Sequence, residues 1–128
     1  MEPSIPPDLL HFIRECIDRL ETLDVLLLLQ ATPARTWTVS QVSDEMRSSP
    51  LAAETALETL ALRGLVEKRD NVFAFHPRDA QLLDKTTRLA AFYREKRTAV
   101  ITAIFSRPND AVRGFAEAFR FKKGGSDG

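Results

Sequence analysis

Residues 37–76 hold the pattern that most restricts how this chain can fold. Two stretches with apolar residues at helical spacing are separated by Arg-Ser-Ser, and Gly64 follows the second stretch. Two short alternating runs of apolar and polar residues then flank Asp70-Asn71. Helical spacing predicts amphipathic helices, glycine often ends a helix, and alternation around two turn residues predicts a hairpin. This segment is therefore expected to form helix, turn, helix and hairpin in that order.

The ends of these elements carry recognisable signals. Thr38 is expected to cap the first helix, because Gln41 follows three residues later at capping-box spacing. Ser49 caps the second helix, and Pro50 occupies its first position, where the missing N–H costs nothing. The hairpin turn lacks the usual glycine at its second place, so the hairpin should be short or somewhat strained. Trp37 is expected in the core, between helix and hairpin.

Helical patterns also flank this segment on both sides. Apolar residues at three- and four-residue steps predict one helix that Asp8 caps and that runs to about Gln30. An uninterrupted pattern over residues 79–107, free of Gly and Pro, predicts a single helix about 40 Å long at roughly 1.5 Å per residue. Residues 111–121 predict a short amphipathic helix.

The length of 128 residues and the apolar content of 44% suit one core, expected as a domain over residues 8–78 with a helical arm over residues 79–121. Residues 1–7 and 122–128 are expected to be disordered. The lone Cys16 excludes an internal disulfide framework, and no apolar run reaches the length of about 18 residues that a spanning helix needs. Since no secretory leader opens the chain, we expect a cytoplasmic protein with no membrane partner.

Charge is unevenly distributed although the chain is neutral overall. Residues 1–60 contain ten acidic and four basic residues, so residues 61–128 contain six more basic than acidic residues. These bases gather in residues 85–97 and 113–123, which favours an acidic partner for the hairpin and the C-terminal arm. A head-to-tail or intertwined dimer would use the same asymmetry, and solvated helix faces would explain it as well.

Residues 37–76 resemble the winged helix-turn-helix of bacterial MarR-type transcriptional regulators. The resemblance rests on the helix order and on the ending Leu60-x-x-x-Gly64-Leu65-Val66, and the pairing of an N-terminal helix with a long C-terminal helix adds to it. It implies a mainly α fold: a winged helix-turn-helix domain of three helices and a small β-hairpin wing, then a long C-terminal helix and a short terminal amphipathic helix. The supporting helix, the recognition helix and the wing would be residues 38–46, 50–63 and 67–75.

The resemblance implies a transcriptional regulator that binds double-stranded DNA as a homodimer. Candidate DNA-binding residues are polar positions of the recognition helix and the cations near it: Arg47, Thr55, Thr59, Arg63, Lys68 and Arg69. Candidate dimerisation residues follow the apolar stripes of the long C-terminal helix: Leu82, Leu89, Tyr93, Val100, Ile104 and Phe105.

The recognition helix departs from the family's pattern. Its outward positions include Leu51, Ala52, Glu54 and Glu58 in place of the Arg, Lys, Asn, Gln or Ser side chains that read base edges. Phosphates would repel the two carboxylates. The alternative is therefore a non-enzymatic adaptor, which uses the winged-helix fold to bind a protein partner through residues 51–58.

No set of residues predicts catalysis or a bound cofactor. His11 and Cys16 are five residues apart, about 140° around a helix, so they do not share a face as ligands at i and i+4 do. His76 abuts Pro77, and neither histidine has a catalytic motif around it. We therefore expect no metal, no cofactor and no enzymatic activity.

Overall fold

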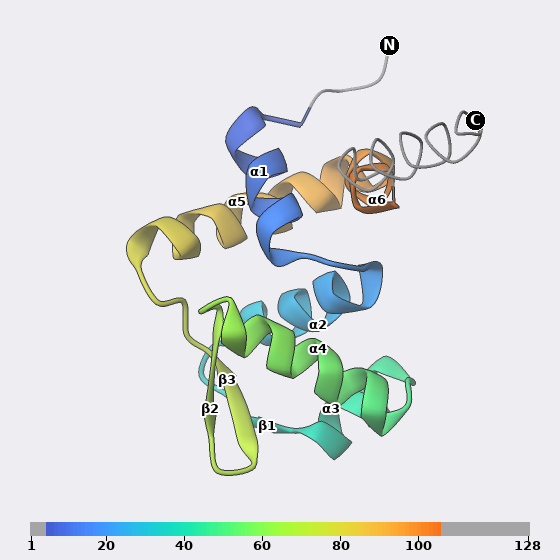
Figure 1. Ribbon diagram of the computed structural model, residues 1–128, viewed down its shortest axis with the longest axis vertical. Helices are drawn as coiled ribbons and strands as arrows, with labels where there is room; N and C mark the ends of the chain where they lie inside the picture. The colour runs from blue at the N-terminus through green and yellow to red at the C-terminus, as the bar shows by residue number, and fades with distance from the viewer. Residues whose placement is uncertain (1–4, 106–128) are drawn as a thin grey trace, which may run out of the picture.

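A computed structural model describes residues 5–105, which form a mainly helical fold with a small antiparallel sheet (Figure 1). The helices are α1 (Pro7–Cys16), α2 (Leu20–Gln30), α3 (Val39–Met46), α4 (Pro50–Leu62), α5 (Ala80–Glu95) and α6 (Arg97–Phe105). The strands are β1 (Trp37–Thr38), β2 (Val66–Arg69) and β3 (Val72–Phe75). The helix expected over residues 111–121 and the disorder expected over residues 122–128 lie outside the described residues.

The predicted succession of helix, turn, helix and hairpin is confirmed, and its local signals act as expected. The amide of Gln41 donates to Thr38 Oγ1 at 3.1 Å and the amide of Thr38 donates to Gln41 Oε1 at 3.0 Å, which completes the capping box of α3. Ser49 Oγ accepts from the amide of Ala52 at the start of α4. Gly64 follows α4 with a φ of +82°, a conformation that glycine adopts without strain.

The sheet has the order β1-β3-β2, and both pairings are antiparallel. Strands β2 and β3 form the predicted hairpin, with Asp70 at a φ of 55° in its two-residue turn. Strand β1 was not predicted, because two residues are too few to show alternation. It pairs Trp37 with Phe73 and Thr38 with Val72, so the start of α3 is joined directly to the hairpin.

Trp37 lies in the core as predicted, with an exposed fraction of 2%. Its indole Nε1 donates to Thr32 Oγ1 at 3.1 Å, so the polar end of the ring is satisfied inside the protein. The Arg35 guanidinium lies 3.5 Å from the ring centroid, in cation–π contact. Trp37 thereby holds the loop after α2 against the sheet.

The single N-terminal helix predicted from Asp8 to Gln30 is wrong. Helix α1 ends at Cys16, Ile17 takes an extended conformation with φ −114° and ψ 104°, and α2 begins at Leu20. Helix α1 has exposed residues along one side, whereas no residue of α2 is exposed. A single straight helix would turn the same side toward the core along its whole length. The break changes the direction of the chain, so α2 is surrounded by other elements while α1 keeps one side in solvent.

The single helix predicted over residues 79–107 is also wrong. Its path breaks at Lys96, which leaves the helical region with φ −127° and ψ 54°, although neither Gly nor Pro marks the place. Helix α5 packs on α1 and α2, and α6 packs on α1 and α5. The change of direction lets residues of both helices share one core, namely Leu89 and Tyr93 with Val100 and Ile104.

Helix α2 lies at the centre of that core. It packs against α3, α4, α5 and β3. Four of its side chains have an exposed fraction of 0%: Leu23, Val25, Leu26 and Leu29. At about 1.5–3 kcal/mol for each large aliphatic side chain, their burial is a leading contribution to folding.

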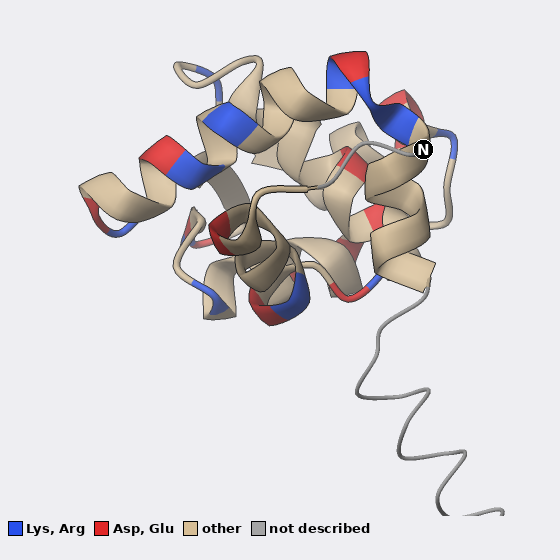
Figure 2. Ribbon diagram, turned by 90° about the horizontal axis from the view of Figure 1, so that it is seen from above, with Lys and Arg blue, Asp and Glu red and all other residues tan. Residues whose placement is uncertain are grey.

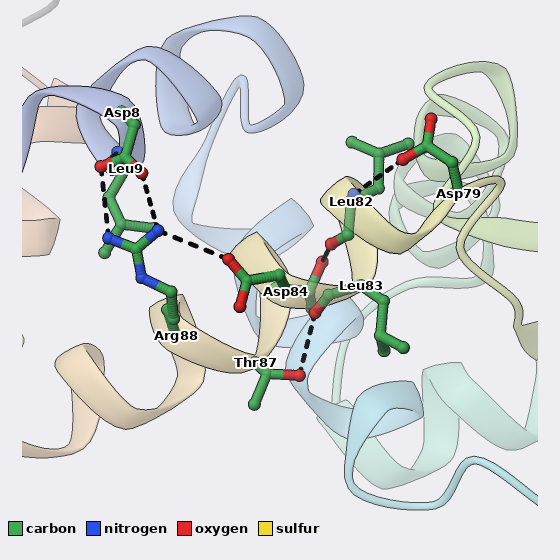
Figure 3. A network of polar contacts seen from close by, with 9 residues as sticks. Asp8, Leu9, Asp79, Leu82, Leu83, Asp84, Thr87 and Arg88 are labelled. Atoms are coloured by element: carbon green, nitrogen blue, oxygen red, sulfur yellow. Dashed lines mark hydrogen bonds and ion pairs between the residues drawn. The ribbon is translucent and has the colours of Figure 1, made fainter.

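Helix α5 is tied to α1 by an ion pair between segments 80 residues apart (Figure 3). Arg88 Nη1 donates to Asp8 Oδ2 at 2.7 Å and Nη2 donates to Asp8 Oδ1 at 3.2 Å, while Asp84 Oδ2 lies 3.5 Å from Nη1. Asp8 was expected to cap α1, but the helix begins at Pro7, so Asp8 sits in the first turn and faces α5. The hydrogen bond from Arg88 lowers the pKa of Asp8.

The charges of α5 are mixed. Acidic and basic segments both occur along it in the view from above (Figure 2): Asp84 precedes the cations that were predicted to gather over residues 85–97, and Glu95 lies among them. This helix therefore presents no field of a single sign.

Replacing a central core residue should cost far more stability than replacing a surface residue of the same type. We expect Leu26→Ala to lower the free energy of unfolding by about 2–5 kcal/mol, since it removes a fully buried side chain. Leu51→Ala is the matched control, because Leu51 is 73% exposed on a helix, and its effect should stay within about 0.5 kcal/mol. Urea denaturation measures both values. Similar losses for the two variants would contradict the central position of α2.

The Asp8–Arg88 pair should stabilise the fold in a pH-dependent way. Because the folded protein holds the pKa of Asp8 below its ordinary value, the pair contributes at neutral pH and is lost as the pH falls through the folded pKa. We expect Asp8→Asn to lower the Tm slightly at pH 7, and we expect this difference from the wild type to shrink as the pH falls through the folded pKa of Asp8. Asp84→Asn should have a smaller effect. A constant difference in Tm across this range would disprove the assignment.

Candidate functional site

The outward side of α4 is the most distinctive surface of the described residues. The helix buries Ala53, Ala56, Leu57 and Leu60, and it packs with that side on α2 and α3. The opposite side forms one shallow depression, here named the α4 face, which is lined by Leu51, Glu54, Thr55, Glu58, Thr59 and Leu62. Apolar and acidic groups therefore share a surface that nothing covers within residues 5–105.

Two leucines stand out on the α4 face. Leu51 is 73% exposed and Leu62 is 78% exposed, although large apolar side chains are usually covered. They are eleven residues apart, which places them within about 20° of each other around the helix. Sequence reasoning missed Leu62, although this eleven-residue spacing was available as a signal.

Lys68 of the hairpin lies beside the α4 face, where it forms an ion pair with Glu58. Lys68 Nζ lies 2.7 Å from Glu58 Oε2 and 5.6 Å from the centroid of the Phe73 ring. The hydrogen bond with Glu58 raises the pKa of Lys68, so the ammonium stays charged at neutral pH. The Lys68 charge that was predicted to contact phosphate is therefore held by a carboxylate of α4.

Arg69 is placed differently. Its Nε lies 3.2 Å from Glu67 Oε2, and its side chain is 77% exposed. Exposed pairs of this kind contribute little, so the guanidinium is easily released to another anion. Arg69 is the cation of the hairpin that a ligand in solution reaches most readily.

The six predicted DNA-binding residues do not form one surface. Thr55, Thr59 and Lys68 lie on or beside the α4 face. Arg47 takes a left-handed conformation with φ 55° in the turn before α4, and Arg63 follows the other end of α4. Thirteen helical residues separate these two arginines, or about 20 Å.

The net charge of this segment opposes contact with phosphates. Residues 37–76 carry six acids and four bases, and Lys68 and Arg69 are each paired with a glutamate. Affinity for DNA depends mainly on cations that neutralise phosphates. The arrangement is thus better suited to a basic partner than to a nucleic acid.

The predicted dimerisation residues are mostly interior. Leu89, Tyr93, Val100 and Ile104 are each at most 9% exposed and pack within the core of a single chain. Leu89 and Tyr93 are buried where α5 packs on α1 and α2, and the break at Lys96 lets Val100 and Ile104 join them by placing α6 against α1. Two members of the set keep accessible surface: Leu82, which is half-buried, and Phe105, which is 70% exposed.

Within residues 5–105, no group of three or more His, Cys, Asp or Glu side chains is placed to hold a metal ion. In the same range, no helix combines the length and apolar character needed to cross a bilayer. Cys16 is buried, and that burial raises the pKa of its thiol. No known protein family, curated protein or solved structure matches this chain, so the resemblance to MarR-type regulators stays a prediction.

The acids of the α4 face should keep the protein from binding DNA tightly. We expect no binding to mixed-sequence duplex DNA at micromolar protein near about 150 mM salt, measured by fluorescence anisotropy. Glu54→Gln with Glu58→Gln removes two negative charges and releases Lys68, so it should raise the affinity at about 50 mM salt and steepen the salt dependence. If the wild type binds with a steep salt slope that Lys68→Glu with Arg69→Glu abolishes, DNA binding through the hairpin is correct.

Proposed function

We propose that this chain is a non-enzymatic binding module of the winged-helix type, and that it docks a protein partner on the α4 face. In this proposal α3 and α4 are the helix-turn-helix and the β2–β3 hairpin is the wing. The order of the elements, the caps of α3 and α4 and the pairing of the hairpin support the fold assignment. The observation that carries the function is the exposed pair Leu51 and Leu62 with carboxylates between them.

The spacing of the apolar groups suggests how a partner would bind. Leu51 and Leu62 lie about 16 Å apart along the axis of α4, at roughly 1.5 Å per residue. Exposed leucines at such spacing act as anchors when a helix or an extended segment lies along the depression between them. Leu51 and Leu62 lie at the two ends of the α4 face with polar residues between them, so contacts to both would align a partner segment with the axis of α4.

The charges suggest what the partner carries. Glu54 and Glu58 lie between the leucines, and Glu58 already attracts Lys68 from the hairpin. A lysine or arginine of a partner would meet the same carboxylates, which favours fast association with basic segments and disfavours nucleic acid. The expected partner is therefore a protein segment with two apolar anchors and basic residues between them.

A DNA-binding regulator is the second candidate function. The observation that favours it is the exposure of Arg69 on the hairpin and of Arg47 in the turn before α4, since both positions flank the helix that would enter the groove. Its weakness is the acidic helix itself, and the anisotropy experiment above separates the two candidates.

A photo-crosslinking amino acid placed on the α4 face should capture the partner. We expect capture from position 51 and not from position 83 on α5, where Leu83 is 46% exposed and serves as the control position. The captured protein is then purified and its affinity measured by calorimetry. Leu51→Glu with Leu62→Glu should weaken binding by more than about tenfold, because both anchors become charged, whereas Leu83→Glu should leave it unchanged.

Thermal unfolding by circular dichroism establishes that each variant is folded. If the purified partner binds the double variant and the wild type with equal affinity, the α4 face is not the docking surface.

A further inference from the structure

A second cavity adjoins the α4 face at Leu62, and its lining comes from α1, the end of α4 and the beginning of α5. Figure 1 shows the arrangement of these helices. Its volume is about 300 Å³. Three cations line it: Arg63 after α4, Arg78 before α5 and Lys85 on α5. We name it the Arg63 cavity. It takes no part in the interactions of the hairpin with the α4 face.

The cations of the Arg63 cavity, Arg63, Arg78 and Lys85, form no ion pairs within the described part of the chain. Glu15 is the one carboxylate in the lining, against these three cations. The lining therefore carries a net charge of two positive units, which favours a bound anion.

Arg78 is joined to Gly64 through the backbone, and its side chain lies beside the same residue. The amide of Arg78 donates to the Gly64 carbonyl at 2.7 Å. A Cβ atom at position 64 would lie 2.9 Å from Arg78 Cζ and 3.0 Å from Nη1, so the guanidinium packs directly against the backbone of Gly64. Arg78 is exposed, so its guanidinium at the edge of the cavity is accessible to a ligand.

The charges of Arg63, Arg78 and Lys85 all act on the thiol of Cys16, which lines the cavity. Burial is the largest influence on Cys16 and raises the pKa of its thiol, while the charges of Arg63, Arg78 and Lys85 each oppose that shift. All three fields thus reach a single sulfur atom that itself lines the cavity. Phe12 and Leu82 add apolar surface to the same lining.

We propose that the Arg63 cavity binds a small organic phosphate monoester. Such a group carries close to two negative charges at pH 7 and so balances the lining, which a singly charged carboxylate would not. Guanidinium groups bind phosphate oxygens through paired hydrogen bonds. The apolar residues hold the organic part, and the cavity volume lies at the lower end for ligand pockets, which restricts the ligand to a small one.

Cys16 provides the readout, because it is the single cysteine of the chain. Cys16 is 7% exposed and lines the cavity, so a reagent reaches its thiol only through the cavity or when the surrounding segments open locally. A ligand bound in the cavity hinders both routes and, being anionic, disfavours the thiolate, so it slows alkylation. The full-length protein is treated with the neutral reagent N-ethylmaleimide, and the rate is followed by mass spectrometry. Phenyl phosphate is the probe, with inorganic phosphate, benzoate and phenol as comparisons.

We expect phenyl phosphate at ten times its Kd to slow alkylation by about tenfold and to raise the Tm. Benzoate, phenol and inorganic phosphate at the same concentration should protect much less. Arg63→Gln and Lys85→Gln should each remove the protection, whereas Arg94→Gln, an exposed change on α5 outside the lining, should retain it.

Several results would overturn the proposal. Absence of protection by phenyl phosphate at about 10 mM would exclude the site, and protection that survives both Arg63→Gln and Lys85→Gln would place binding elsewhere. Equal protection by benzoate would show that the cavity does not prefer a dianion. Equal protection by inorganic phosphate would show that the organic group of the ligand contributes nothing to binding. Unfolding curves of the two variants establish that a lost response reflects the missing cation.

Discussion

Burial of α2 from every side is the constraint on which the rest of the structure depends. None of its eleven residues is exposed, and its aliphatic side chains contact α3, α4, α5 and β3. A helix with this much apolar surface is stable in water only when other elements enclose it. The break after α1 and the change of direction at Lys96 both fit that arrangement, since α5 packs on α2, while α1, α5 and α6 pack on one another and add buried residues to the same core.

The position of α4 against α2 decides what the protein shows to solvent. With Ala53, Leu57 and Leu60 turned inward, the acidic and apolar residues of the other side must face outward. Leu62 at the end of this helix lines both the α4 face and the Arg63 cavity. The two candidate sites therefore share one helix turn, while their chemistry is opposite: one is acidic and the other basic.

Prediction from the sequence succeeded where a signal and its effect lie within a few residues. The capping box of Thr38, the cap at Ser49 and the turn at Asp70-Asn71 each act on their own neighbours. The candidate site was predicted in part: Thr55, Thr59 and Lys68 come together, but the pairing of Lys68 with Glu58 crosses between elements and left no local trace. The helical pattern itself runs without interruption through Lys96, so periodicity could not reveal the break there.

The sequence by itself determined the order of α3, α4 and the hairpin, because hydrogen bonds of caps and turns are made within one or two turns of the chain. Tertiary structure alone decided which apolar stripes are interior and which cations meet. Leu89 and Val100 are suited to a second subunit by pattern, yet they are buried within one chain because packing of α5 and α6 on α1 removes their apolar surface from water. Arg63, Arg78 and Lys85 line one cavity for the same reason: packing at the core brings their segments together.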